Sequence, residues 1–253
     1  MPRKAAQPSL ADTDAAPGGA AAVDRALSLL NAFGAGDASL SLAELARRTG
    51  LYKSTVLRLL ASLRHAGLLR QLADGHYALG PAVARLHAVY AASFSIDQDV
   101  QPVLRALVDQ TRESAAFHVR QGAQRLCLYR VDSPQVLRDH VRMGDVLPLD
   151  RGAGGHVLMA WSGAAVNTSA PDAQRHAELH AQIRRDGVIV LSGDRVPDLT
   201  GISAPVFKAG GELVGALTLT LPTSRLQAGF APAVLAAARG LSAQWGHEGP
   251  LPA

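Results

Sequence analysis

Glycines divide residues 41–72 into short amphipathic pieces, and this punctuation limits the fold more than any other feature of the chain. Ser41 followed by Glu44 is the signature of a capping box, which opens a helix that Gly50 ends. A second run with apolar side chains at helical spacing extends from Lys53 to His65. Two such helices joined by a short glycine-containing turn form a helix-turn-helix.

The neighbouring segments predict a winged version of this motif over residues 21–80. Residues 23–33 carry apolar side chains at helical spacing and stop at Gly34. Two short strand candidates, LLRQL and HYAL, follow the motif and are separated by Asp74-Gly75, a hairpin signal. Three helices followed by a small hairpin make a winged helix-turn-helix.

The helix over residues 53–65 is expected to separate apolar from polar side chains. Four apolar residues are expected to face the domain core: Val56, Leu57, Leu60 and Leu63. Four polar residues lie near the end that enters the major groove in this class of motif: Lys53, Ser54, Thr55 and Arg58. The hydroxyls suit phosphates or base edges, and arginine pairs bidentately with guanine. The alternative is a solvated helix face with a capping hydroxyl.

Positive charge is concentrated in the same segment. Between Ser41 and Leu72, six lysines and arginines stand against the single acid Glu44, a formal charge of +5, whereas the whole 253-residue chain carries +4. Such a patch attracts the phosphate backbone, so we expect double-stranded DNA as a partner.

The remaining sequence predicts a tail, a linker and an α+β domain. Residues 1–20 are rich in Pro, Gly, Ala, Ser and Asp, which predicts a disordered tail. Residues 81–96 form a predicted inter-domain helix with an apolar stripe suited to self-association, made of Leu86, Val89, Tyr90 and Phe94. Residues 97–248 alternate strands and helices; VLRDHVRM, residues 136–143, is one expected strand, and HVLMAWSG, residues 156–163, one expected helix.

The segment LAELARRTGLYKSTVLRLLASLRHAGLL resembles the DNA-binding signature of IclR-type bacterial transcription regulators. Tyr52 stands where that family usually has proline; the turn is expected to survive, and Tyr52 to add a phosphate contact. The resemblance runs from about residue 23 to 245 and includes LPLDRGAGGHVLMAW, where His156 replaces a lysine, and a later segment in which Asp198 replaces a glycine. It implies DNA contacts by Arg48, Tyr52, Lys53, Ser54, Thr55 and Arg58.

This resemblance also implies a GAF-like effector-binding and oligomerisation domain. The protein is then expected to bind a near-palindromic operator as a homodimer or a dimer of dimers, and to change its DNA affinity or activity when a small organic acid binds.

An effector pocket is expected where RGAGGH precedes a helix, because free backbone N–H groups there seat a carboxylate and the glycines permit close approach. Thr218 and Thr220 share one face of a strand and are expected to donate further hydrogen bonds. Asp194 would accept from a ligand hydroxyl or hold a loop. The predicted effector-binding residues are Leu147, Ala153, Gly154, Gly155, Asp194, Ile202, Ser203, Thr218 and Thr220. The alternatives are a flexible glycine turn and threonines that face solvent.

The sequence contains no motif that indicates a disulfide, a metal site or a catalytic site. Cys127 is the only cysteine and lies in an apolar run, so neither a disulfide nor a multi-cysteine metal site is expected. His176 and His180 flank Glu178 in HAELH, which is no known metalloprotease motif. We expect no catalytic residues, metal, cofactor, membrane span or secretory signal, and a cytoplasmic protein. The alternative function is a small-molecule enzyme, such as a thiol-based reductase, with a GAF-like domain fused to a DNA-binding head.

Overall fold

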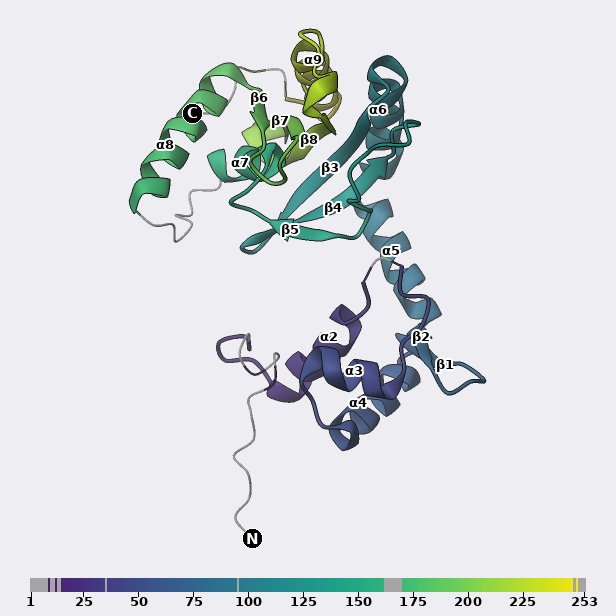
Figure 1. Cartoon of the computed structure of the whole chain (residues 1–253). Helices are drawn as coiled ribbons and strands as arrows, with labels where there is room; N and C mark the ends of the chain where they lie inside the picture. The colour runs from purple at the N-terminus through teal and green to yellow at the C-terminus, as the bar shows by residue number, and fades with distance from the viewer. Residues whose placement is uncertain are drawn as a thin grey trace. The chain divides into compact units, whose positions relative to one another are not determined.

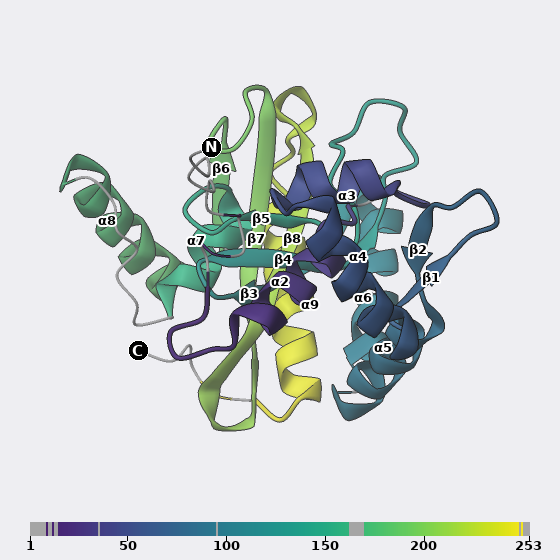
Figure 2. The same ribbon diagram turned by 90° about the horizontal axis from the view of Figure 1, so that it is seen from below.

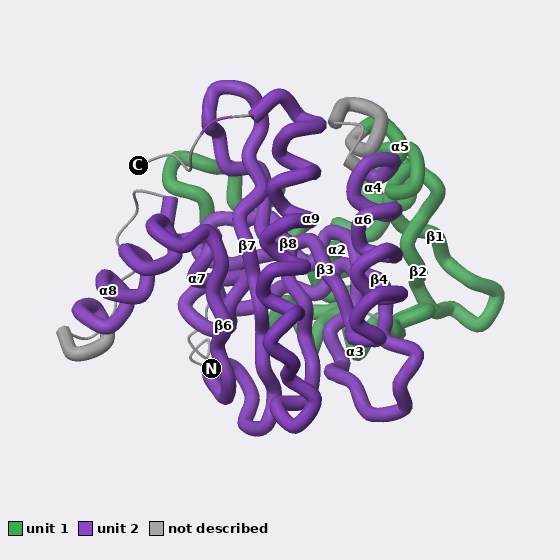
Figure 3. Tube along the Cα trace, turned by 90° about the horizontal axis from the view of Figure 1, so that it is seen from above, with its two compact units in different colours: residues 1–94 green, residues 95–253 purple. Residues whose placement is uncertain are grey.

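The computed structural model describes residues 9, 12, 15–34, 36–94, 96–161, 170–247 and 249. The chain divides into two compact units, residues 1–94 and residues 95–253, which Figure 3 shows in green and purple. Each unit has its own buried apolar core.

The first unit is a winged helix-turn-helix, as the sequence predicts (Figure 1). Its helices are α2 (Ala21–Asn31), α3 (Leu42–Thr49) and α4 (Lys53–His65). The wing is the antiparallel pair β1 (Leu69–Gln71) and β2 (Tyr77–Leu79), and Leu40 adds a single bridge to Tyr77. The helix α5 (Pro81–Phe94) follows.

Local signals explain the turn of the motif. The Ser41 hydroxyl accepts a hydrogen bond from the Glu44 N–H at 3.1 Å, but the Glu44 carboxylate binds arginines, so one half of the predicted capping box is seen. Gly50 takes a left-handed conformation with φ of 70°. Tyr52 has φ of −65°, the angle that a proline ring would impose, which is why the turn tolerates the replacement.

The prediction that Leu57 faces the core is wrong. The side chains of Val56, Leu60 and Leu63 are buried in the first unit, whereas Leu57 is 49% exposed. Successive residues of a helix lie about 100° apart, so Leu57 is turned away from the stripe that begins at Val56.

The second unit is built on a six-stranded antiparallel sheet, counted over its described residues, with the order β5-β4-β3-β8-β7-β6. The strands are β3 (Ser114–Gln121), β4 (Gln124–Val131), β5 (Val146–Pro148), β6 (Ile189–Ser192), β7 (Leu199–Lys208) and β8 (Glu212–Pro222). The helices are α6 (Ile96–Thr111), α7 (Ala153–Ala160), α8 (Ala170–Asp186) and α9 (Phe230–Gln244), with short 3-10 turns at Ala209–Gly211 and Thr223–Arg225. This confirms the predicted α+β, GAF-like class.

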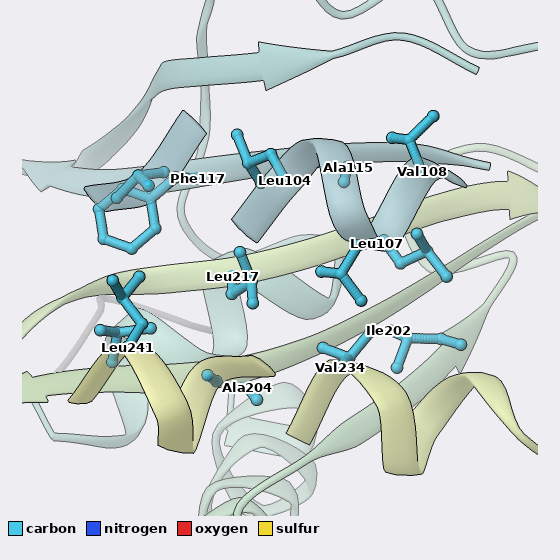
Figure 4. Packing of buried hydrophobic residues seen from close by; sticks show 14 of the residues in the cluster. Leu104, Leu107, Val108, Ala115, Phe117, Ile202, Ala204, Leu217, Val234 and Leu241 are labelled. Atoms are coloured by element: carbon cyan, nitrogen blue, oxygen red, sulfur yellow. The ribbon is translucent and has the colours of Figure 1, made fainter. Parts of the chain in front are cut away.

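Helices cover both faces of this sheet. The helices α6 and α9 pack on one face, α7 packs on the other, and α8 lies against α7, as Figure 2 shows. The larger core lies between the sheet and α6 with α9; Figure 4 shows Phe117, Leu217 and Ile202 there, facing Leu104 and Val234.

Two predicted elements differ from the structure. Residues 136–143 form no strand, because Val136 is 99% exposed while Asp139, three residues on, is buried against Arg130. The helix expected from His156 begins three residues earlier, at Ala153, so the glycines of RGAGGH belong partly to its first turn.

Several predictions fall outside the described residues. Most of the predicted tail belongs there, as do the side chains of Tyr90 and Phe94. Of the predicted apolar stripe, Leu86 and Val89 are described, and both side chains are more than half exposed.

The position of Ile202 in the core can be tested by cavity formation. We expect Ile202→Ala to lower the free energy of unfolding by about 2–5 kcal/mol in urea, because the fully buried side chain leaves a cavity under α9. The partly exposed Val190→Ala on β6 is the control and should cost much less. A cost for Ile202→Ala no larger than that of the control would contradict the placement.

Candidate functional site

The first candidate surface is the outer face of α4. The side chains of Tyr52, Lys53, Ser54 and Arg58 are exposed there, and Thr55 is half-buried. Within the described part of the chain, Lys53 and Arg58 form no ion pair, so both cations remain available to a polyanion. Exposed Leu57 adds an apolar group to the same face.

Arg48 has a different environment from the other predicted DNA-binding residues. Its guanidinium donates to the Asp37 carboxylate, to Glu44 at 2.8 Å and to the Ala32 carbonyl at 2.9 Å. Arg47 also binds Glu44, at 2.6 Å, and the two arginines hold the pKa of that carboxyl down at about 2. Arg48 therefore ties α3 to the segment after α2, and its charge is largely compensated.

The remaining arginines extend the positive surface toward the wing. Arg64, near the end of α4, and Arg70, on β1, line an open cleft. Neither forms an ion pair with a described residue. Uncompensated positive charge of the first unit thus includes that on α4 and β1, the helix and hairpin that approach DNA in this type of motif.

The second candidate surface is a pocket between the sheet and the start of α7, here called the α7 pocket. Six of the predicted effector-binding residues line it: Leu147, Ala153, Gly154, Asp194, Thr218 and Thr220. The other lining residues are His118, Arg125, Arg130, Asp139, Val141, Gly152, Leu191, Arg195, Val196, Leu199, Thr200 and Gly201. The strand register explains the pair of threonines, because Thr218 and Thr220 alternate with Leu217, Leu219 and Leu221 of the core.

Three predicted residues lie elsewhere. Ile202 is on the opposite face of the sheet, in the core beneath α6 and α9, so its assignment to the pocket wall is corrected. Ser203 is buried beside the pocket, with its hydroxyl 2.9 Å from Thr218 Oγ1 and donating to the Leu217 carbonyl at 3.1 Å. Gly155 packs against the chain behind the pocket.

The glycines at the start of α7 have a packing role. The sequence interpretation had instead expected them to permit close approach of a ligand. A Cβ atom at Gly155 would lie 2.2 Å from the Leu149 carbonyl oxygen, and one at Gly154 would lie 2.8 Å from Thr218 Oγ1. Only glycine at these positions lets the first turn of α7 rest on the sheet. As the first two residues of the helix, Ala153 and Gly154 have N–H groups without an intrahelical acceptor.

Asp194 holds the loop before α7. Its carboxylate accepts the Gly152 N–H at 2.6 Å and lies 3.2 Å from His156 Nε2, and Arg175 is 3.5 Å away. An ionised carboxylate only accepts, so His156 Nε2 is the donor. The His156 bond first, and the Gly152 N–H with it, lower the pKa of Asp194 to about 2. Of the two roles expected for Asp194, the structure gives it the loop-holding one.

The sequence interpretation missed six polar residues of the pocket, namely His118, Arg125, Arg130, Asp139, Arg195 and Thr200. Arg125 comes from β4 and His118 from β3, and both side chains are buried. Neither ring nitrogen of His118 has a hydrogen-bond partner. Burial, together with Arg125 and Arg130, lowers the pKa of His118 well below its usual range, so the ring is neutral at pH 7. The only signal for Arg125 in the sequence was that RLCLYRV carries arginines at two positions of an otherwise apolar run.

A buried ion-pair network closes one side of the pocket. Arg130 donates to Asp139 at 2.5 Å and to Asp132 at 2.7 Å, and Arg195 lies 3.4 Å from the second Asp139 oxygen. The negative charge of Asp139 is therefore balanced by two arginines, Arg130 and Arg195.

The structure gives little support to thiol chemistry or metal binding. The Cys127 thiol is buried, and burial raises its pKa to about 12, so it is no thiolate nucleophile at neutral pH. His176 and His180 lie on α8 beside His156, with ring centroids 4.9 and 5.7 Å from it. Among the described residues, no three His, Cys, Asp or Glu side chains are arranged to hold a metal ion. None of the described helices is both long enough and apolar enough to cross a membrane.

The Asp194 contact predicts a pH-dependent contribution to stability. Because its pKa is lowered from 3.8 to about 2 in the folded protein, its contribution is full above pH 4 and disappears as the pH falls toward 2. Asp194→Asn should therefore reduce the free energy of unfolding by about 1–3 kcal/mol at pH 7. In chemical denaturation, the gap between the two proteins should narrow between pH 4 and 2; a gap that is constant with pH would contradict the assignment.

Comparison with known proteins matches each unit to a family domain. Residues 88–244 match the C-terminal domain of the IclR bacterial transcriptional regulators, and residues 22–73 match the IclR helix-turn-helix domain. The transcriptional repressor IclR of Escherichia coli K12 is 26% identical over 243 residues, 89% of this chain and 89% of the repressor. The HTH-type transcriptional regulator BhcR of Paracoccus denitrificans is 26% identical over 244 residues, 89% of this chain and 87% of the regulator.

Solved structures show the same fold. A putative IclR regulator from Silicibacter sp. TM1040 is 28% identical, with a TM-score of 0.77 over 92% of this chain and all of the other. An IclR homologue from Microbacterium hydrocarbonoxydans, crystallised with 4-hydroxybenzoate, is 20% identical, with a TM-score of 0.78 over 88% of this chain and 98% of the other. The chain therefore belongs to the IclR family of bacterial transcriptional regulators.

Proposed function

We propose that this regulator binds a near-palindromic DNA operator as a homodimer or a dimer of dimers and changes its DNA affinity or activity when a small organic acid occupies the α7 pocket. The observation that carries the DNA-binding half is the uncompensated positive face of α4. Lys53 and Arg58 are exposed and unpaired among the described residues, whereas Arg47 and Arg48 are bound to acids.

In this proposal the N-terminal end of α4 enters the major groove. Arg58 reads a guanine, Lys53 contacts phosphate, and Ser54 and Thr55 contact phosphates or base edges. Tyr52 is exposed at the helix start and adds a phosphate contact. Arg48 holds α3 in place through Asp37 and Glu44, so its part in DNA binding is to position the motif.

Two copies are needed because one winged helix contacts too few bases for specific binding. A dimer places two copies of α4 in successive major grooves, about 34 Å apart, which requires a near-palindromic site. The exposed side chains of Leu86 and Val89 on α5 supply apolar surface for self-association.

The effector half of the proposal rests on the polar groups that converge in the α7 pocket. The free N–H groups at the start of α7 and the Thr220 hydroxyl suit a carboxylate, and Thr218 Oγ1, whose proton goes to Ser203, suits a hydroxyl of the ligand as an acceptor. The relative crystallised with 4-hydroxybenzoate supports an acid of this class. Regulation then requires that the acid bind the DNA-competent and DNA-incompetent states with different affinity.

The roles of Arg58 and Lys53 predict different losses on alanine substitution. Using a duplex selected from a random library, we expect Arg58→Ala to cost about 1–3 kcal/mol and to relax specificity at one base pair. Lys53→Ala should weaken all sequences alike and reduce the slope of log affinity against log salt by about one. Exposed Arg105→Ala on α6 is the control. Selected-duplex affinity that is unchanged in both α4 variants would refute the interface.

Self-association predicts a molar mass of at least two chains. Light scattering at micromolar concentration should give a dimer or tetramer, and Leu86→Glu with Val89→Glu should shift it toward the monomer and weaken operator binding, because charges are buried at the interface. Full operator affinity of a monomeric wild-type protein would rule out the dimer.

A further inference from the structure

Arg125 is a buried cation without an anionic partner. The residue is 3% exposed, and its Nε has no hydrogen-bond partner. One terminal nitrogen donates to the Arg151 carbonyl, which supplies a dipole but no charge. Asp150 and Asp194 act on it only through space, and no described carboxylate forms an ion pair with it.

Its guanidinium lies under the first turn of α7. A Cβ atom at Gly155 would lie 2.3 Å from one terminal nitrogen of Arg125, and one at Gly152 would lie 3.0 Å from the other. The same side chain lines the α7 pocket together with Ala153 and Gly154, whose N–H groups are free at the helix start. A full positive charge and the positive end of a helix therefore meet at one wall of the pocket.

The other charges of the pocket are compensated. Arg130 and Arg195 are paired with Asp139 and Asp132, and Asp194 is bound by His156 and the Gly152 N–H. Among the described residues that line the pocket, Arg125 is the charged side chain without an ion-pair partner. Burial lowers the pKa of Arg125 to about 10, which leaves it protonated at neutral pH. An unpaired buried charge is costly to a fold, so this cation demands an anion from outside the chain.

We propose that Arg125 selects the charge of the effector, so that the α7 pocket takes small molecules with a single carboxylate, held between the Arg125 guanidinium and the N–H groups of Ala153 and Gly154. This proposal rests on the effector half of the proposed function. The neutral His118 ring, which has no partner of its own, meets a hydroxyl or carbonyl oxygen of the same ligand. A second carboxylate finds no free cation and meets Asp139 and Asp194 instead, so dicarboxylates bind less well.

The rival interpretation is that Arg125 holds the loop through the Arg151 carbonyl. The two roles predict opposite effects of Arg125→Met on the ligand-free protein. A loop-holding arginine is needed for stability, so its loss would lower Tm. A ligand-neutralised cation costs stability until the ligand arrives, so its removal raises Tm in sodium chloride.

Thermal unfolding with paired acids and amides tests the proposal. Wild type, Arg125→Met, Arg125→Lys and the exposed control Arg120→Met are compared in acetate against acetamide, benzoate against benzamide, and benzoate against terephthalate, at constant ionic strength. We expect at least one monocarboxylate to raise Tm of the wild type and of Arg120→Met above the effect of its amide. Arg125→Lys should keep part of this response and Arg125→Met none, and calorimetry with that acid should show affinity reduced roughly 10- to 100-fold in Arg125→Met.

The proposal is overturned if acids and their amides act alike on the wild type, if Arg125→Met responds to the acid as the wild type does, or if the dicarboxylate is preferred. If Arg125→Met does not fold, the proposal fails on its stability prediction, and Arg125→Lys still reports on acid against amide. Operator affinity of the same variants without acid is measured in parallel. Normal operator binding with no acid response would refute this inference and leave the DNA-binding proposal standing.

Discussion

The second unit depends on how closely α7 approaches the sheet. Gly154 and Gly155 bring the first turn of the helix onto Thr218 and the Leu149 carbonyl, where a single methyl group would collide. That approach creates the pocket, because it places free helix N–H groups over polar side chains of β3, β4 and β8. Asp194 then fixes the loop by accepting the Gly152 N–H and pairing with His156. The packing of α7 and the shape of the pocket therefore depend on the same few residues, and a bulky change at either glycine would disturb both.

The sequence predicted well where the signals were local. The cap at Ser41, the helix over residues 53–65 and the hairpin at Asp74-Gly75 each depend on neighbouring residues, and the structure has all three. The two-residue period of a β-strand also predicted correctly that Thr218 and Thr220 share one face of the sheet. These features need no knowledge of what packs against them.

Prediction failed where the partner was distant in the chain. Ile202 and Ser203 are neighbours on a strand and point to opposite faces, so both could not line one pocket, and only the packing of α6 and α9 decides which face is core. The role of Arg125 could hardly be predicted from its neighbours in the sequence. It depends on a loop about 26 residues later and on glycines that leave room for the guanidinium. Residues 136–143 read as a strand by alternation, yet Asp139 is drawn inward by Arg130, and Val136 is left in solvent.

Charge compensation separates paired from unpaired cations in both units. In the first unit Arg47 and Arg48 are bound to acids, while Lys53, Arg58, Arg64 and Arg70 are not. In the second unit Arg130 and Arg195 share Asp139, while Arg125 has none. An exposed unpaired cation costs little because water solvates it, so a surface of them serves a polyanion reversibly. A buried one lacks that solvation, so the anion that neutralises it stabilises whichever state holds the guanidinium under α7. An acid that binds there with equal affinity in two states would shift nothing, so the proposed control of DNA binding requires that the contacts of the acid in the α7 pocket differ between those states.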